Sequence, residues 1–259
     1  MLPIQPTRST AMHAACSPRL AIEDVQPVVE GGRFAVKCLC HRPVTVTAVI
    51  FADGHEQLAA NLLWRTEGQE NWQRVAMQPL GNDHWTAGLV PHEVARLEFA
   101  IEAWQDPYAS YCNELLKKLG AGLAVSLELQ EGAQLVRRIC AQADLAQGHD
   151  LAGLVERLES CQTQDERVTL LLAPATAELL AHAEYRPHLL RSPLYPLDVE
   201  RPLAEFASWY ELFPRSESGD ARRHGTFNDV RRRLGDIVAM GFDVLYFPPI
   251  HPIGRTHRK

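Results

Sequence analysis

The sequence predicts a multidomain fold in which an antiparallel β-sandwich and a helical bundle precede a strand-helix-strand unit of a parallel α/β domain. Residues 20–106 hold short runs of alternating apolar residues separated by turn residues. Residues 108–186 carry apolar residues at spacings of three and four, which is typical of amphipathic helices. Residues 207–247 hold two apolar runs that flank a segment with a helix cap and a glycine stop.

Charge and composition exclude several classes of protein. The chain of 259 residues has a formal net charge of -6 and a pI of about 6.0, whereas binding to nucleic acid or anionic lipid needs clustered Lys and Arg. No apolar run approaches the roughly 18 residues that a membrane-spanning helix requires, and the N-terminal region lacks the apolar core of a secretion signal. We expect no nucleic-acid partner, no membrane partner and a cytoplasmic location.

The cysteine and histidine pattern predicts neither a disulfide framework nor a metal site. Six cysteines are scattered over the chain, so reduced thiols are expected. Cys38, Cys40 and His41 lie in a strand-like run without a second ligand pair at zinc-site spacing. His251 and His257 have a spacing that matches no helical or turn-based site. We therefore expect no metal and no cofactor.

The first predicted domain is an immunoglobulin-like β-sandwich formed by residues 20–107 together with residues 192–200. Residues 1–19 are rich in Pro, Ser and Thr and are expected to form a disordered lead. The expected strands cover residues 34–38, 44–50, 72–77, 84–89 and 97–104. Because Gly81, Asn82 and Asp83 favour a tight turn, residues 72–77 and 84–89 are expected to form a hairpin.

Four tryptophans in this region have two possible roles. Aromatic side chains can stack on sugar rings, but in small sandwiches they more often fill the core. The core role is the base case for Trp64, Trp72, Trp85 and Trp104.

Residues 108–188 are predicted to form a helical bundle inserted in, or appended to, the sandwich. A break at residues 120–122 separates the first two helices, and residues 167–180 would supply the fourth. The bundle has neither a glycine-rich phosphate loop nor inward acidic pairs, so packing or self-association is its expected role. Extended chain resumes after Pro193 as a return strand.

The last region, residues 201–259, begins with the strand-helix-strand unit. Residues 209–213 form an apolar run closed by Pro214, and residues 242–247 form a second run that should pair with the first in parallel through a right-handed crossover. Thr226 and Asp229 occupy the positions of a capping box, and Gly241 stops the helix at a left-handed position. One helix face is expected to hold Val230, Leu234, Ile237 and Val238.

Three motifs in this region carry a resemblance to a known family. Residues 207–216 (ASWYELFPRS), 224–227 (HGTF) and 240–254 (MGFDVLYFPPIHPIG) resemble the α-1,4-glucan:maltose-1-phosphate maltosyltransferases of the α-amylase superfamily, glycoside hydrolase family 13 type. The pattern from Gly241 to Ile250 is general to that superfamily, whereas the WYELFPRS run is specific to this group.

The resemblance implies an enzyme of α-glucan (glycogen) biosynthesis. Its fold would be an N-terminal sandwich, a helical bundle used in homodimerisation, and then a catalytic (β/α)8 barrel that this chain only begins. Its substrates would be α-maltose 1-phosphate and an α-1,4-glucan acceptor, used by retaining double displacement. The chain is expected to be an N-terminal part that ends before the catalytic carboxylates, so it contains no catalytic residue.

The resemblance also implies one substrate-binding residue. Lys259 matches the lysine of an Arg-Lys pair after the second strand, which contacts the maltosyl unit; a frayed terminal lysine is the plain alternative. Glu211 and Asp243 belong to strand segments and are expected to serve structure. Arg215 and Arg223 could bind phosphate, although exposed arginines after a strand are usually solvated.

Two alternatives remain open from the sequence. The chain could be a non-catalytic module for dimerisation or glycan binding. It could also belong to another amylase-superfamily enzyme that hydrolyses, branches or isomerises its substrate, because those barrels share the pattern that leads to Pro248 and Pro249.

Overall fold

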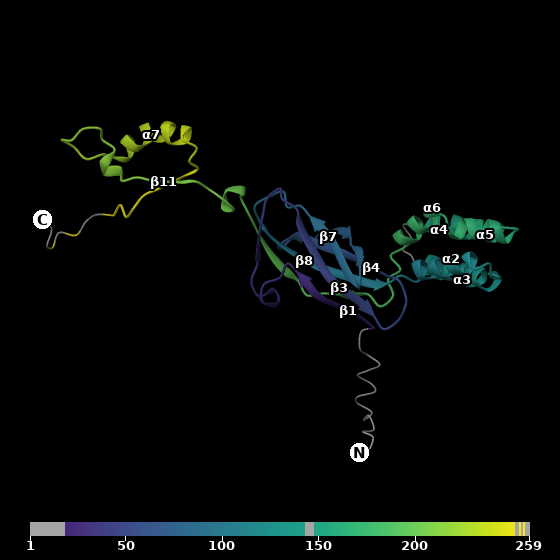
Figure 1. Cartoon of the computed structure of the whole chain (residues 1–259). Coiled ribbons are helices and arrows are strands. Elements are labelled where there is room, and N and C mark those ends of the chain that lie inside the picture. Colours follow the sequence, from purple (N-terminus) through teal and green to yellow (C-terminus); the bar gives the residue numbers. More distant parts are fainter. Residues whose placement is uncertain (1–18, 143–147, 252–253, 255, 257–259) are drawn as a thin grey trace, which may run out of the picture. The chain divides into compact units, whose positions relative to one another are not determined.

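The structure is a computed structural model that describes residues 19–142, 148–251, 254 and 256. These residues form two compact units (Figure 1). The first contains the described residues up to Val36 and the segments Pro43–Leu89 and Arg96–Leu197. The second contains Lys37–Arg42, Val90–Ala95 and the described residues from Asp198 onward. Apart from Arg19, the N-terminal lead predicted for residues 1–19 lies outside the described residues.

One sheet of the first unit is antiparallel throughout and has the strand order β1-β3-β7-β6. Its strands are β1 (Leu20–Gln26), β3 (Val44–Ala52), β7 (His84–Leu89) and β6 (Gln78–Gly81). Alternate residues of β3, namely Val46, Ala48 and Ile50, are fully buried. Because successive side chains on a strand point to opposite faces, this alternation shows which face of the sheet lies on the core.

The other sheet has the strand order β2-β10-β8-β4-β5, and β9 also pairs with β8. Its strands are β2 (Val36–Leu39), β10 (Tyr195–Glu200), β8 (Arg96–Gln105), β4 (Leu58–Thr66), β5 (Gln73–Ala76) and β9 (Leu190–Arg191). Strands of the two sheets contact each other, and Leu62, Phe99 and Ile101 are fully buried. The first unit is therefore built around two packed sheets.

The predicted hairpin is present, but its first strand was misplaced. The structure pairs β7 with β6 rather than with residues 72–77, which form β5 and pair with β4. The chain changes sheets at Met77, whose backbone N–H donates to the carbonyl of Ala60. The turn at Gly81, Asn82 and Asp83 is as predicted, with positive φ at all three residues.

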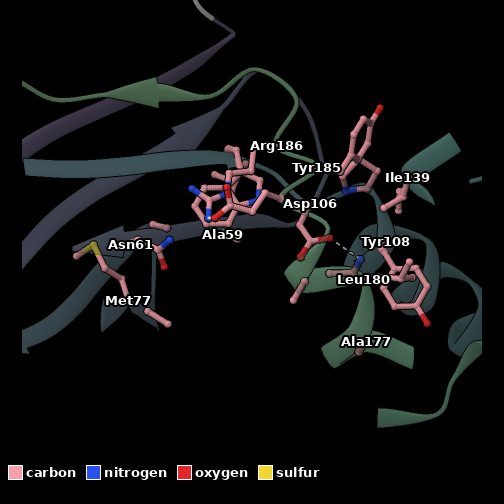
Figure 2. A pocket seen from close by; sticks show the side chains of 18 of the residues that line it. Ala59, Asn61, Met77, Asp106, Tyr108, Ile139, Ala177, Leu180, Tyr185 and Arg186 are labelled. Carbon is pink, nitrogen blue, oxygen red and sulfur yellow. Dashed lines mark hydrogen bonds and ion pairs between the residues drawn. The ribbon is translucent and has the colours of Figure 1, made fainter. Parts of the chain in front are cut away.

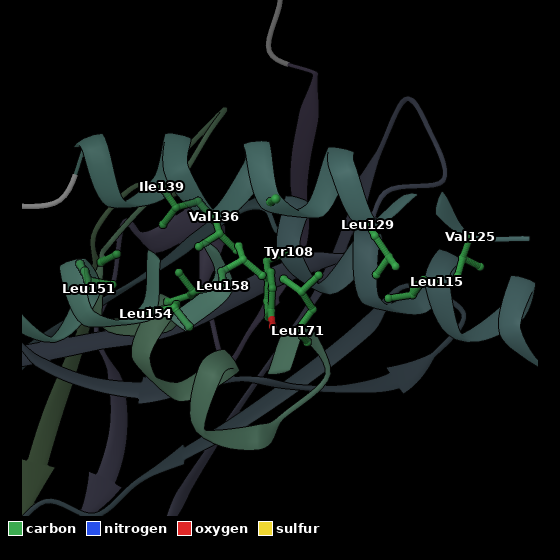
Figure 3. Packing of buried hydrophobic residues seen from close by; sticks show 13 residues of the cluster. Tyr108, Leu115, Val125, Leu129, Val136, Ile139, Leu151, Leu154, Leu158 and Leu171 are labelled. Atoms are coloured by element: carbon green, nitrogen blue, oxygen red, sulfur yellow. Dashed lines mark hydrogen bonds between the residues drawn. The ribbon is translucent and has the colours of Figure 1, made fainter. Parts of the chain in front are cut away.

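Five helices of the described residues form the bundle. They are α2 (Pro107–Gly120), α3 (Ser126–Gln142), α4 (Gly148–Ser160), α5 (Gln164–Leu171) and α6 (Pro174–His182). In Figure 1, α2 and α3 form one layer, and α4, α5 and α6 form the other. Figure 3 shows the core between the layers, where Leu115, Val136, Leu154 and Leu171 are fully buried. The cluster of buried apolar side chains that holds the bundle together contains residues from all five of these helices.

Two expectations about the bundle were wrong. The fourth predicted helix is divided into α5 and α6, because Pro174 cannot donate the backbone hydrogen bond that a continuous helix needs and instead begins a new helix. Leu116 and Leu127, two of the apolar residues in the helical pattern predicted for residues 108–186, are 56% and 61% exposed. These leucines lie on the outer surface of their helices.

The second unit contains a parallel strand-helix-strand arrangement. Strand β11 (Trp209–Glu211) pairs in parallel with β12 (Val244–Tyr246), and α7 (Phe227–Ala239) lies between them in the chain. The parallel pairing confirms the sequence prediction. Among the residues that the structure describes, short 3-10 turns lie at Glu30–Gly32, Pro202–Ala204 and Pro214–Ser216.

The apolar core of this arrangement is small. Leu212, Val230 and Ile237 are buried, with Tyr210 and Leu245 packed against them. The stop at Gly241, with a φ of 87°, is as predicted. The predicted helix face was too wide, since Leu234 is 41% and Val238 is 69% exposed. One short pair of strands covers only part of an apolar helix face.

Candidate functional site

The carboxyl ends of β11 and β12 lie at the same edge because the strands are parallel. The segments that follow them begin at Leu212 and Phe247, and His251 in the second segment is exposed. Lys259, the predicted substrate-binding residue, and His257 lie outside the described residues. In parallel α/β folds, functional residues gather at this edge of the sheet.

The loop from Pro214 to Thr226, which follows β11, is closed by a glycine. The N–H of Gly225 donates to the carbonyl of Arg215 over 2.7 Å. A Cβ at Gly225 would lie 2.2 Å from the carbonyl oxygen of Pro214. Since backbone atoms cannot move aside as a flexible side chain would, a glycine is required where the two ends of this loop approach each other.

Asp229 fastens the same loop to the start of α7. Its carboxylate accepts hydrogen bonds from the two terminal guanidinium nitrogens of Arg223 at 2.8 and 2.9 Å and from the backbone N–H of Thr226 at 2.7 Å. Arg232 also contacts the carboxylate. Asp229 is 3% exposed, and the bonds from Arg223 and then Thr226 hold its pKa well below the usual range for a carboxyl group.

These contacts involve one of the two arginines for which the sequence suggested phosphate binding. Arg223 was expected to be solvated or to bind phosphate, but its guanidinium is committed to Asp229. Arg215 is exposed, and within the described part of the chain its side chain has no hydrogen-bond or ion-pair partner. Asp243 accepts a hydrogen bond from the N–H of Ser208 at 2.9 Å, which agrees with the structural role expected for it.

The first unit contains a cavity of about 620 Å³ between the second sheet and the bundle. Figure 2 shows Asn61 and Met77 on the sheet side, Tyr108 and Leu180 on the helix side, and Arg186 between them. The lining is mainly apolar. A cavity of this size and character is typical of a small-molecule site.

A buried ion network forms part of the cavity wall. The side chain of Glu102 on β8 is 1% exposed, and its oxygens accept from Arg186 at 2.6 Å and Arg191 at 3.2 Å. Asn61 donates to the same carboxylate at 3.2 Å, and Arg74 lies 3.8 Å away. The network connects β4, β5 and β8 with the segment that leaves the bundle, so it fixes the cavity wall.

The sequence interpretation missed this network. Glu102 lies at a polar position of the alternating run at residues 97–104, and such a position predicts exposure to solvent. Arg186 and Arg191 are separated from Glu102 by 84 and 89 residues along the chain. Their presence directly after the helical region was the available signal, but it did not identify which carboxylate they pair with.

The four tryptophans do not form an open sugar platform. Trp64 and Trp85 are 9% and 8% exposed, as the core role predicts. The guanidinium of Arg186 lies 4.6 Å from the ring of Trp104, and that of Arg65 lies 4.2 Å from the ring of Trp72. Each of these two rings therefore has a cation over one face.

The described residues contain neither a cluster of metal-ligating side chains nor a helix suited to span a membrane. Within residues 19–142, 148–251, 254 and 256, no three His, Cys, Asp or Glu side chains are grouped so that they could hold a metal ion. Over the same residues, no helix has both the length and the apolar character needed to cross a bilayer.

The sequence of the chain is similar to a described family and to several named proteins. A family model described as "Alpha-1,4-glucan:maltose-1-phosphate maltosyltransferase, domain N/S" matches residues 18–201. A protein of Pseudomonas aeruginosa named α-1,4-glucan:maltose-1-phosphate maltosyltransferase is 55% identical over 242 residues, which is 93% of this chain and 36% of that protein. Proteins with the same name from Burkholderia pseudomallei and Cereibacter sphaeroides are 45% and 41% identical, over 98% and 93% of this chain. The chain spans 22% and 40% of their respective lengths.

Proposed function

This chain belongs to the α-1,4-glucan:maltose-1-phosphate maltosyltransferase family, and from that premise we propose that it is the N-terminal part of such an enzyme. The complete enzyme would transfer maltosyl units from α-maltose 1-phosphate to the non-reducing ends of α-1,4-glucans, with retention and release of phosphate. The observation that carries the proposal is the order of elements. The N/S family match ends at residue 201, and the parallel pair β11 and β12 follows, with the WYELFPRS motif beginning on β11 and continuing into the loop after it.

We assign the two sheets to an immunoglobulin-like sandwich and the β11-α7-β12 unit to the start of a catalytic (β/α)8 barrel. In such a barrel the loop fastened by Asp229 lies on the active face, because loops that follow the strands form that face. The bundle would contribute to a homodimer, and the enzyme would act in the cytoplasm. Lys259 would donate hydrogen bonds to hydroxyls of the maltosyl unit.

The chemistry would need two carboxylates, which we place in the part of the relatives that this chain does not span. One would attack the anomeric carbon as the bond to the phosphate oxygen breaks, giving a glycosyl-enzyme ester. The other would then accept the proton of the acceptor 4-hydroxyl as that oxygen displaces the ester. Glu102 and Asp229 have no part in these steps because arginines occupy their oxygens.

The direct experiment measures phosphate release by the whole protein from maltose 1-phosphate, with and without a glucan acceptor. We expect release that depends on the acceptor and is accompanied by chain lengthening in steps of two glucose units. Hydrolysis, branching or isomerisation without phosphate release would favour another amylase-superfamily activity. Glucan binding without any turnover would favour a non-catalytic module.

A matched pair of lysine variants tests the assignment of Lys259. Lys259→Ala should raise the KM for maltose 1-phosphate about tenfold, because losing a hydrogen bond from a charged donor costs about 1.5 kcal/mol. Lys117→Ala, at an exposed position on α2, should leave the KM unchanged. Equal KM values for the two variants would contradict the assignment.

A further inference from the structure

A second hollow of the first unit lies beside the cavity of Figure 2. It has a volume of about 460 Å³ and is formed by the end of β3, the loop before β4 and the turn between β6 and β7. Leu58, Pro79 and Trp85 line both the hollow and the cavity, so the two adjoin there. We call the hollow and the adjoining cavity together the N-domain groove.

The hollow offers several polar side chains that have no partner among the described residues. Glu56, Asn82, Asp83 and His84 line it, and in the described part of the chain none of these side chains takes part in a hydrogen bond or ion pair. They supply both donors and acceptors. By contrast, Arg186 and Glu184 in the adjoining cavity are already paired with each other.

Aromatic surface lies next to these polar groups. Phe51 lines the hollow and is 38% exposed, while Trp85 is mostly buried where the hollow meets the cavity. An exposed aromatic face beside unpaired donors and acceptors matches the two sides of a sugar ring, since C–H groups pack on the aromatic face and hydroxyls form hydrogen bonds.

The charges of the hollow favour a neutral ligand. Its ionisable carboxyl groups, Glu56 and Asp83, would repel a phosphate at neutral pH. A metal ion is not favoured either, because no group of three possible ligands exists among the described residues. Pro79 on the edge strand β6 has no N–H to donate, which disfavours a peptide that would add as another strand.

We propose that the N-domain groove is a non-catalytic binding site for the α-1,4-glucan chain, separate from the site that takes maltose 1-phosphate. This inference rests on the proposed function, because the acceptor of that reaction is a neutral polymer of sugar rings. The hollow holds one end of a glucan segment, and the cavity extends the path toward Tyr185 and Asn61. Binding here raises the local concentration of chain ends for the reaction.

The test uses the whole protein and three single variants at exposed positions. Phe51→Ala and Glu56→Ala alter the hollow without removing a buried side chain. Phe34→Ala is the matched control, since Phe34 is 49% exposed, lies in the same unit and lines neither hollow nor cavity. The two readouts are retardation in native gels that contain glycogen, and the KM for glycogen compared with the KM for maltotetraose.

We expect Phe51→Ala and Glu56→Ala to weaken glycogen retention and raise the KM for glycogen by about threefold to tenfold, given the usual strength of an aromatic contact for Phe51 and of a hydrogen bond for Glu56. The KM for maltotetraose, the KM for maltose 1-phosphate and kcat should stay at the control values. Glycogen retention equal to the control would overturn the inference, as would equal losses with glycogen and maltotetraose. If the protein releases no phosphate but the groove variants still lose glycogen retention, the proposed reaction is wrong. The assignment of the N-domain groove as a glucan-binding site then still stands.

Discussion

Glu102 and Asp229 are the two acidic residues of the described chain whose buried carboxylates are each surrounded by more than one arginine. Glu102 is paired with residues distant in sequence, whereas Asp229 is paired within six residues. This difference explains what the sequence could predict. The capping position of Asp229 follows from local spacing, but the partners of Glu102 depend on how the chain returns from the bundle.

Replacing Glu102 should strongly destabilise the first unit. Glu102→Leu leaves Arg186, whose side chain is 14% exposed, without its main partner, and breaking a buried ion pair costs about 3–5 kcal/mol. Urea denaturation of the whole protein checks this. Asp53→Asn, which removes an exposed pair with Arg19, is the control and should cost no more than about 1 kcal/mol. If both variants lose the same small free energy of unfolding, the Glu102 network contributes little to stability.

The Asp229 contacts predict a pH dependence of stability. Because the folded-state pKa of this carboxyl group is lowered, its contribution is complete above the unfolded pKa of about 4 and is lost as the pH falls through the folded value. Asp229→Asn should therefore lower the melting temperature at pH 7, and the difference from the native protein should shrink below about pH 4. A difference that stays constant from pH 7 to pH 3 would contradict this origin.

Among the elements, α3 shows how tertiary packing can reverse a local preference. Alanine is normally favoured over glycine inside a helix by about 1 kcal/mol. Gly132 on α3 is buried, and a Cβ there would lie 2.2 Å from the hydroxyl oxygen of Tyr111 and 2.3 Å from a ring carbon. Helix α2 can approach α3 closely at this point because the side chain is absent.

Two glycine substitutions should therefore have opposite signs. Gly132→Ala should lower the free energy of unfolding by about 1–3 kcal/mol, the usual cost of overpacking. Gly153→Ala on α4 meets nothing within 4 Å and should raise it by about 0.5–1 kcal/mol. Chemical denaturation of the two variants measures both. Stabilisation by Gly132→Ala would mean that Tyr111 can move aside without cost.

The existence of most elements could be predicted from the sequence, while several boundaries and pairings could not. Alternation predicted strands at the places of β2, β3, β5, β7 and β8, but β1 and β4 were not among the expected strands. The Thr226 cap with the Gly241 stop predicted α7. The sheet change at Met77 depends on a backbone bond to Ala60, which local pattern does not encode. For the candidate site, the motif at residues 240–254 predicted the sheet edge after β12. It did not predict the cavity or the unpaired side chains around Phe51.

At the scale of the whole molecule, the two units differ in how much apolar surface they bury. The first has packed sheets and a continuous bundle core. In the second, Tyr210 and Leu245 face α7, so the alternating residues Trp209 and Tyr246 lie on the other side of the strands and are 62% and 45% exposed. A two-stranded sheet with one bare face is marginally stable in water.

This contrast predicts unequal protection from hydrogen exchange in the chain of 259 residues. Amides of β3, β4, β8 and α3 should exchange slowly because opening them exposes the buried core of the first unit. Amides of β11, α7 and β12 should exchange within seconds to minutes, and in the whole protein they should become as slow as those of β8. Exchange measured by mass spectrometry on both proteins gives the comparison.

Slow exchange of α7 in the chain of 259 residues would contradict the prediction. It would show that the small core of Leu212, Val230 and Ile237 is sufficient to keep this unit folded.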